Sequence, residues 1–362
     1  MNKDILFEPY LLADIELKNK IVMAPMTRSR AIGNVPNSLM AEYYSQRSGA
    51  GLIVTEGVSP SPDGLGYSRI PGLYSKEQTN AWKLVTAAVH AKGSRIFAQL
   101  MHTGRISTRH NLPEGARTVA PSAVQAPDKI WCDAAGMVEH DVPEAMSLEM
   151  LFHARGEYVK AAVNAIEARF DGIELHGANG YLLEQFLSPH TNQRTDNYGG
   201  SVQNRTRFLL EVIDETITAI GKNKIGIRFS PYGAGGGMKP YDEIEETYEF
   251  LANELNKRGI AYIHLVDHSA MGAPAVPQSV KDKIRNNFSG TLISAGGFNV
   301  DSAVELVSGK GADLVAFGKP FINNPDLVER LRNDWPLSDK LDFKTFYTSD
   351  SVGYTDYPNY QA

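Results

Sequence analysis

Eight short apolar runs recur along the chain, and each is followed by a stretch in which apolar residues have helical spacing. The runs are Ile21–Pro25, Leu52–Glu56, Arg95–Leu100, Gly172–His176, Ile225–Ser230, Tyr262–Val266, Thr291–Gly296 and Leu314–Gly318. They are almost continuously apolar rather than alternating, which is typical of parallel strands that are covered on both faces. A strand followed by a helix, repeated eight times, predicts an α/β protein built as a single (β/α)8 TIM barrel.

The helical stretches carry start and stop signals that support this division. They are Asn37–Ser48, Lys76–Lys92, Ser147–Arg169, Ser201–Ile220, Pro240–Arg258, Pro277–Asn287, Asn299–Ser308 and Asn324–Asn333. The alternative fold is a doubly wound open sheet, which usually places a glycine-rich turn after its first strand. Here that turn reads APMTRSRA and contains no glycine, so the barrel is favoured.

Two segments lie outside the repeat. Phe7–Lys20 contains two short extended pieces and is expected to form a hairpin that closes the N-terminal end of the barrel. His102–Met146, after the third strand, is about 45 residues rich in Pro, Gly and Ala. A loop of that length in a compact domain is usually functional, so we expect a lid with short strands of its own. No domain boundary is evident, and residues 1–362 are expected to form one domain.

Composition narrows the class of protein. The net charge of -6 argues against nucleic acid as the main partner. No apolar run approaches the roughly 20 residues of a membrane span, and the N-terminus lacks the pattern of a signal peptide. Cys132 is the single cysteine, so neither an internal disulfide nor a cysteine-ligated metal cluster is expected. We therefore expect a cytoplasmic protein with no membrane or nucleic-acid partner.

The strongest candidate for a site follows the fourth strand, within Asp171–Ser201. His176, Asn179 and Tyr181 fall within six residues at the strand end, which is where barrel enzymes carry their chemistry. An imidazole, an amide and a phenol suit binding a substrate oxygen and delivering a proton. Taken singly, His176 could be a hydrogen-bonded structural histidine and Asn179 an amide that caps a loop. The presence of three polar groups within six residues favours a functional site. No second histidine or carboxylate has ligand spacing with His176, so no metal is expected.

Other strand ends add candidates. Glycines and a lysine follow strands seven and eight, the recurrent phosphate site of this fold, at Gly296, Gly297, Gly318 and Lys319. Arg228 lies inside an apolar strand and needs a partner, which could be Glu174, Glu56 or an anionic cofactor. The glycine-rich segment 232–239 does not match a phosphate-binding loop, and we expect a mobile loop on the substrate side. His264 alternates with apolar residues, which favours a structural role.

These motifs together resemble the Old Yellow Enzyme family of FMN-dependent ene-reductases along essentially the whole chain. The similarity is greatest to the bacterial N-ethylmaleimide, pentaerythritol tetranitrate and morphinone reductase branch. The matching stretches are IVMAPMTRSRA, MAEYYSQRSGAGLIVTEG, HTGR, ELHGANGYLLEQFLSPHTNQRTDNYGGSVQNRTRF, KRGIAYIHL, DLVAFGKPFINNPDLVERL and GYTDYP. The stretch from Asp171 to Ser201 is the most specific of them.

The resemblance implies a role for each matching residue. FMN, bound tightly but not covalently, would contact Pro25, Met26, Thr27, Gly57, Gln99 and Arg228, with its phosphate held by Gly296, Gly297, Gly318 and Lys319. The substrate pocket would include Tyr67, Met101 and Tyr347. His176 and Asn179 would bind the substrate oxygen, and Tyr181 would protonate the α-carbon.

The resemblance also implies a reaction. NAD(P)H would reduce FMN and leave before the substrate enters, in a ping-pong cycle. The substrates would be electrophilic alkenes, namely α,β-unsaturated carbonyls, maleimides or nitro compounds. The protein would act as a monomer or a homodimer.

Two departures from the family pattern bear on the pocket. Met101 stands where relatives have Trp in Q-L-W-H-T-G-R, so we expect a wider pocket. Thr27 stands where another group has a redox-sensing cysteine.

Three alternative functions can be weighed against this one. An iron–sulfur relative with this barrel is excluded by the single cysteine and the chain length. A barrel lyase or aldolase would need a Schiff-base lysine, and none lies in the eight predicted strands. A flavin-binding protein without turnover is disfavoured by the presence of His176, Asn179 and Tyr181 together.

Overall fold

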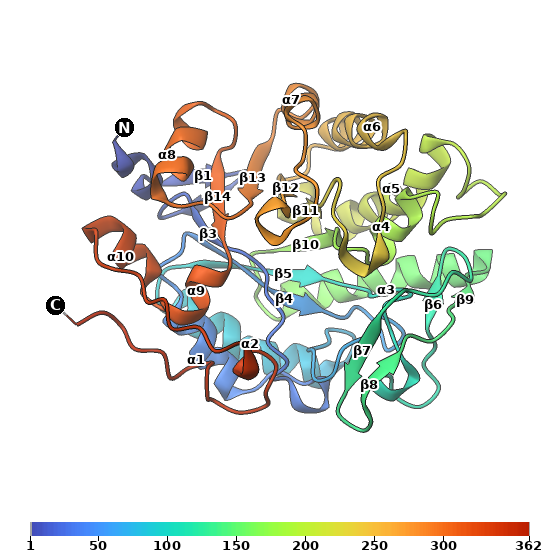
Figure 1. Cartoon of the computed structure of the whole chain (residues 1–362), viewed down its shortest axis with the longest axis horizontal. Coiled ribbons are helices and arrows are strands. Elements are labelled where there is room, and N and C mark those ends of the chain that lie inside the picture. Colours follow the sequence, from blue (N-terminus) through green and yellow to red (C-terminus); the bar gives the residue numbers. More distant parts are fainter. Residues whose placement is uncertain (1, 362) are drawn as a thin grey trace.

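A computed structural model describes residues 2–361 and contains a closed barrel of eight parallel strands (Figure 1). The strands are β3 (Ile21–Met23), β4 (Leu52–Val58), β5 (Arg95–Leu100), β10 (Gly172–Gly177), β11 (Ile225–Phe229), β12 (Tyr262–Val266), β13 (Thr291–Ala295) and β14 (Leu314–Phe317). Each pairs with the next along the chain, and β14 returns to β3. The TIM-barrel prediction is confirmed, and the open sheet is excluded by this closure.

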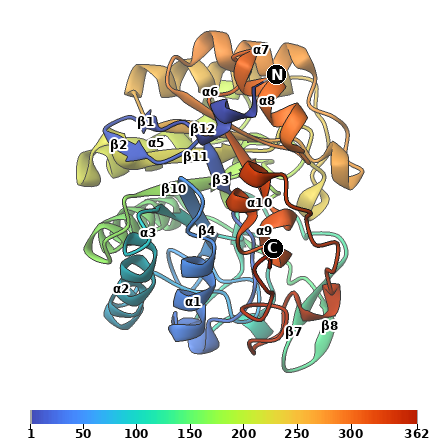
Figure 2. The same ribbon diagram turned by 90° about the vertical axis from the view of Figure 1, so that its left-hand side faces the viewer.

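Helices surround the barrel and cover its outer face (Figures 1 and 2). They are α1 (Ser38–Gln46), α2 (Lys76–His90), α3 (Leu148–Glu167), α5 (Val202–Ile220), α6 (Ile244–Arg258), α7 (Gln278–Asn287), α8 (Val300–Ser308) and α10 (Leu327–Asn333). Single 3-10 turns occupy 3–7, 32–34, 109–111, 222–224, 235–237, 269–271 and 343–345. Within residues 2–361, no helix is long and apolar enough to cross a membrane.

Helix boundaries follow local capping, with two corrections. Ser75 accepts the Gln78 N–H and forms a capping box at the start of α2. Gly259, with φ of 65°, ends α6 in a left-handed conformation that glycine adopts without strain. The prediction that this helix starts at Pro240 was wrong, because residues 240–241 are irregular and 242–243 form a turn before it. The helix predicted from Asn324 also starts later, at Leu327, after a turn at 325–326. The short helices α4 (Leu182–Leu187) and α9 (Lys319–Asn323) were missed because neither is long enough to show periodicity.

The N-terminal hairpin closes one end of the barrel, as expected. Its strands β1 (Tyr10–Leu12) and β2 (Ile15–Leu17) pair antiparallel. The Tyr10 hydroxyl lies 2.9 Å from Thr291 Oγ1, and Arg95 Nε donates to the Glu16 carbonyl at 3.3 Å. Because Thr291 and Arg95 begin β13 and β5, the hairpin lies over the N-terminal ends of the strands.

Aromatic rings fill the barrel near this closed end. A Cβ on Gly226 would lie 2.1 Å from the Tyr262 ring, and one on Gly172 would lie 2.5 Å from the Phe97 ring. These two glycines therefore leave room for the two rings, whose centroids are 5.7 Å apart. The interior is thus occupied at its N-terminal end, and a cavity is left at the opposite end, where the strands point.

The long loop after β5 has short strands of its own, as expected. β6 (Val119–Ala120) pairs with β9 (Glu144–Ala145), and β7 (Lys129–Cys132) pairs antiparallel with β8 (Gly136–Glu139). Figure 1 shows the β7–β8 hairpin projecting beyond the barrel. This hairpin forms one side of the cavity mouth.

The C-terminal segment, residues 336–361, crosses the same end of the molecule. Two arginines that follow β3 hold it in place. Arg28 Nη2 donates to the Gly353 carbonyl at 2.6 Å, and Arg30 Nη2 donates to the Thr345 carbonyl at 2.7 Å. Both arginines are fully buried. Their charge-assisted hydrogen bonds bring Tyr347 to the cavity.

Candidate active site

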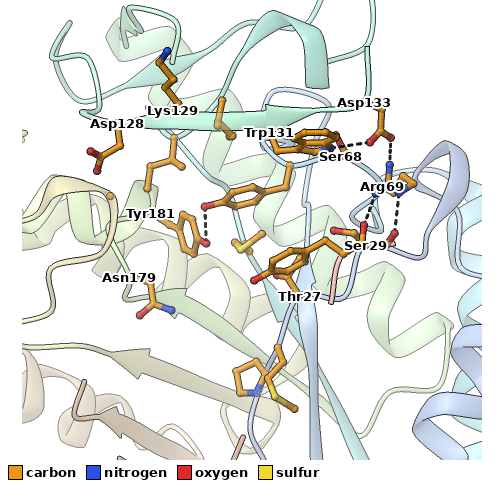
Figure 3. Close-up of a pocket in the computed structure, with 18 of the residues that line it drawn as sticks. Thr27, Ser29, Ser68, Arg69, Asp128, Lys129, Trp131, Asp133, Asn179 and Tyr181 are labelled. Carbon is orange, nitrogen blue, oxygen red and sulfur yellow. Dashed lines mark hydrogen bonds and ion pairs between the residues drawn. The ribbon is translucent and has the colours of Figure 1, made fainter. Parts of the chain in front are cut away.

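A cavity of about 1010 Å³ opens at the C-terminal ends of the barrel strands. Barrel residues form its floor, and the β7–β8 hairpin and the C-terminal segment form its mouth. Figure 3 shows Thr27, Asn179 and Tyr181 facing this space, with Asp128, Lys129 and Trp131 of the hairpin above them. The wall includes these predicted site residues: Pro25, Met26, Thr27, Tyr67, Gln99, Met101, His176, Asn179, Tyr181, Arg228 and Tyr347.

His176 and Asn179 form a pair at the end of β10. Asn179 Nδ2 lies 3.4 Å from His176 Nε2. Asn179 has φ of 59°, in the left-handed region that asparagine tolerates better than most residues. Its backbone N–H donates to Ser230 Oγ at 2.8 Å, which holds this turn against β11. The strand end and the turn together place an imidazole and an amide side by side on the cavity wall.

His176 is a neutral hydrogen-bonding group at physiological pH. Burial lowers the pKa of its imidazole well below the ordinary value, and the positive charge of Arg228 lowers it further. His176 Nδ1 is buried and has no hydrogen-bond partner within residues 2–361. A neutral ring that carries its proton on Nε2 can donate a hydrogen bond into the cavity without carrying a charge there.

Tyr181 lies beside His176 and contacts a second phenol. The Tyr181 hydroxyl donates to the Tyr67 hydroxyl at 3.1 Å, and its ring lies edge-on to His176 with centroids 4.7 Å apart. Burial is the main factor that raises the pKa of the Tyr181 hydroxyl well above its ordinary value, and it also raises the pKa of Tyr67. Tyr181 therefore holds its proton and releases it only to a strong base such as a carbanion.

Beneath the cavity lies a buried polar network. Gln99 Nε2 donates to Glu174 Oε1 at 2.8 Å, and His264 Nδ1 lies 2.8 Å from Glu174 Oε2. Burial acts to raise the pKa of Glu174, but His264 and Arg228 outweigh it and the net shift is downward. Glu174 is therefore ionised, and each of its two carboxylate oxygens has a hydrogen-bond partner. The position of His264 agrees with the structural role expected from the sequence.

Arg228 is the buried positive charge of the site. Glu56 is not its partner, because that carboxylate accepts from the Arg28 N–H and the Tyr44 hydroxyl. Within residues 2–361, Arg228 forms no ion pair shorter than 4.0 Å, and its buried Nε has no hydrogen-bond partner. The charge of Glu174 acts on it through space. A cation this buried and this incompletely paired suits an anionic group bound in the cavity.

The other predicted residues lie next to the cavity rather than on its wall. A Cβ on Gly57 would lie 2.4 Å from Met101 Sδ, so this glycine makes room for the methionine side chain. A Cβ on Gly318 would lie 3.6 Å from Sδ of Met26, which does line the cavity. Gly296, Gly297 and Lys319 lie at the adjacent ends of β13 and β14, with Lys319 exposed.

The mouth of the cavity is held by a residue that the sequence did not reveal. Arg69 contacts three segments that are distant along the chain (Figure 3). It pairs with Asp133 in the turn of the β7–β8 hairpin, donates to the Tyr347 carbonyl at 2.6 Å and donates to the Ser29 carbonyl at 3.0 Å. Its φ of 56° is unusual for a residue of this size, and these contacts hold it there.

Two further groups around Asn179 were also missed. His268 Nε2 lies 2.7 Å from Asn179 Oδ1. Glu184 accepts the Gly180 N–H at 2.6 Å and the Ser230 hydroxyl at 2.9 Å. Their positions depend on contacts between strands that no local motif records. Within residues 2–361, no group of three or more His, Cys, Asp or Glu side chains could hold a metal ion.

Comparison with known proteins identifies the family. The model described as "NADH:flavin oxidoreductase / NADH oxidase family" matches residues 5–338. 12-Oxophytodienoate reductase 7 of Oryza sativa subsp. japonica is 40% identical, covering 98% of this chain and 94% of that protein. 12-Oxophytodienoate reductase 2 of Arabidopsis thaliana is 39% identical, covering 99% and 96% respectively.

Solved structures agree. Morphinone reductase superposes with a TM-score of 0.94 at 41% identity, covering 98% of this chain and 96% of that one. The Old Yellow Enzyme homologue of Zymomonas mobilis gives a TM-score of 0.93 at 38% identity, covering 98% and 99%. With the barrel and its polar cavity, these matches place the chain in the NADH:flavin oxidoreductase / NADH oxidase family, the FMN-dependent oxidoreductases that include the Old Yellow Enzymes.

Proposed function

We propose that this protein is an FMN-dependent NAD(P)H ene-reductase that reduces activated C=C bonds in α,β-unsaturated carbonyls, maleimides or nitro compounds. The observation that carries the proposal is the pairing of His176 with Asn179 beside the buried phenol of Tyr181. Two neutral donors next to a weak acid suit binding one substrate oxygen and protonating a nearby carbon.

The residues opposite this pair fit FMN. The unpartnered Nε of Arg228 suits an electron-rich ring edge. The NH₂ end of the Gln99 side-chain amide donates to Glu174. Its side-chain oxygen is therefore the end that can accept a hydrogen bond from FMN. Pro25, Met26 and Thr27 line one wall, and Gly318 adjoins them.

The resemblance to the Old Yellow Enzymes gives specific roles to the residues that would hold FMN. Gly57 and Gln99 would contact the ring edge, Thr27 would place its hydroxyl near O4, and Arg228 would face the N1/O2 side. The phosphate would be held at Gly296, Gly297, Gly318 and Lys319, where backbone N–H groups and one cation are available. When bound, FMN supplies the chemistry of accepting a hydride from NAD(P)H and giving one to the substrate.

The remaining steps are carried out by the chain itself. His176 and Asn179 donate hydrogen bonds to the carbonyl or nitro oxygen of the substrate. This withdraws electron density from the β-carbon and stabilises the negative charge that develops on the oxygen. Tyr181 then transfers its proton to the α-carbon, so that the substrate gains one hydride and one proton in total.

Purification tests the assignment directly. The protein should carry bound yellow FMN, lose its colour on anaerobic addition of NAD(P)H and regain it with cyclohexenone, a maleimide or a nitroalkene. A colourless protein that cannot be reconstituted with FMN would refute the proposal. So would reduced FMN that reacts with none of these compounds.

A Schiff-base lyase is not supported. Within residues 2–361, the lysines on the cavity wall are Lys129 of the hairpin and Lys344 of the C-terminal segment, and neither belongs to the barrel. A cytoplasmic location and a monomeric or homodimeric state belong to the proposal. The single cysteine, which is buried and unpaired, fits the proposed location. Cell fractionation tests the location, and gel filtration tests the oligomeric state.

Met101 is expected to set the width of the pocket. It packs with Leu65, Ile70 and Tyr67 and lines the cavity. Because even a Cβ on Gly57 would lie 2.4 Å from the Met101 sulfur, there is little free space on that side, and a Trp at position 101 has to extend into the cavity. Met101→Trp should therefore change the facial preference or lower the size limit for bulky enones, as measured by chiral chromatography of the products. Unchanged product ratios and rates across a substrate panel would contradict this.

Tyr67 is expected to support proton transfer from Tyr181. When Tyr181 gives up its proton, the Tyr67 hydroxyl is the group that can donate to the resulting phenolate. Loss of one such bond, at ~1 kcal/mol, should make Tyr67→Phe about fivefold slower in FMN reoxidation by an enone, measured by stopped-flow absorbance. In a Tyr181→Phe background the same change should have no further effect. An equal loss in both backgrounds would mean that Tyr67 only shapes the pocket.

A further inference from the structure

We infer that His268 is a positioning residue that determines which end of the Asn179 amide faces the substrate. This rests on the proposed function of Asn179. His268 follows β12 and lies outside the cavity wall within residues 2–361, yet its Nε2 is 2.7 Å from Asn179 Oδ1. It therefore contacts the Asn179 amide from outside the cavity wall.

The two ends of an amide have nearly the same shape, so hydrogen-bond partners decide its orientation. Asn179 Oδ1 is taken by His268, and Nδ2 is left beside His176 Nε2 at 3.4 Å. In this orientation the NH₂ group can donate to a substrate oxygen. In the reversed orientation the amide would present an oxygen to the substrate oxygen, and one donor would become a repulsive contact.

The surroundings of His268 favour the proton on Nε2. Its Nδ1 is buried and has no partner within residues 2–361. A proton on Nδ1 would therefore be a buried, unpaired donor, whereas on Nε2 it bonds Asn179 Oδ1. Burial, followed by the positive charge of Arg228, lowers the pKa of His268 to about 4, so the ring carries a single N–H at neutral pH.

The backbone of the turn is held without His268. The Asn179 N–H bonds Ser230 Oγ, and Glu184 accepts from both Ser230 and the Gly180 N–H. Substituting His268 should thus release the amide side chain while the turn keeps its conformation. This separates positioning of the amide from a general structural role.

The contact can be tested without turnover. In holoenzyme labelled with ¹⁵N-histidine, the His268 resonances, assigned by their loss in His268→Gln, should show the proton on Nε2. A proton on Nδ1 would overturn the inference, because Nε2 would then accept from the Asn179 NH₂ group and turn Oδ1 toward the cavity.

Rate measurements test whether loss of the His268 donor slows the reaction with substrate. His268→Phe removes the donor and keeps a ring, and should slow FMN reoxidation at saturating cyclohexenone about tenfold, which corresponds to one lost hydrogen bond. His268→Gln retains an N–H donor and should recover to within about threefold of the wild-type rate. Equal rates for Phe and Gln would overturn the inference.

A double-mutant cycle shows whether His268 acts through Asn179. In an Asn179→Gly background, His268→Phe should change the reoxidation rate by less than about twofold, because there is no amide left to orient. Losses that multiply would assign His268 a separate role and overturn the inference. If wild-type reduced FMN reacts with no enone, the proposed function itself fails, whereas the histidine tautomer still reports on the contact.

Discussion

Replacing Tyr181 with phenylalanine is expected to slow the reoxidation of reduced FMN by an enone ~100-fold or more, the usual contribution of a positioned general acid. Reduction of FMN by NAD(P)H should stay within about twofold, because that half-reaction needs no proton from the phenol. The buried, protonated hydroxyl beside His176 is the basis for this expectation.

Anaerobic stopped-flow absorbance measures the two half-reactions separately. Tyr10→Phe is a matched control, because it also removes one hydroxyl but at the closed end of the barrel, where Tyr10 contacts Thr291. Both half-reactions should be unchanged in that variant. Equal losses in both half-reactions of Tyr181→Phe would mean that the phenol shapes the pocket and does not supply the proton.

Removing the Asn179 amide should have a similarly large effect. Loss of one donor to a developing oxyanion typically costs about 10²- to 10³-fold in rate. Asn179→Gly is the appropriate substitution, because φ at this position is 59° and glycine adopts it without strain, whereas alanine does not. The enone reoxidation rate should therefore fall about 100-fold with little change in melting temperature.

A second left-handed asparagine provides the control for this variant. Asn34 has φ of 61° and lies outside the cavity wall within residues 2–361. Asn34→Gly makes the same chemical change in the same backbone conformation and should leave the reoxidation rate unaltered. A normal rate in Asn179→Gly would show that His176 alone holds the substrate oxygen.

The barrel could be predicted because its strands are buried on both faces. A continuous apolar run such as Ile225–Ser230 identifies a buried strand from the sequence alone. In a parallel barrel the C-terminal ends of all strands lie at the same end of the molecule. His176 and Arg228 were candidates because of their places on the strands, and Gln99 through the family resemblance; all three line one cavity.

Contacts between distant segments could not be predicted in the same way. His268 and Asn179 are 89 residues apart, and their hydrogen bond depends on how the turns after β10 and β12 meet. The Arg69 contacts join segments that no pattern connects. The phosphate role of Lys319 stays a prediction, since that side chain lies exposed at the end of β14.

The way Arg69 ties the hairpin to the C-terminal segment has a consequence for how such an enzyme can diversify. The groups proposed to act on the reacting bond stand on the barrel, whereas Trp131 and Tyr347, which a substrate meets first, stand on segments clamped together at the rim. Exchanging the hairpin can therefore retune which molecules are admitted while the reactive centre stays intact. Natural or laboratory selection can therefore vary the hairpin without changing the residues proposed to act on the reacting bond.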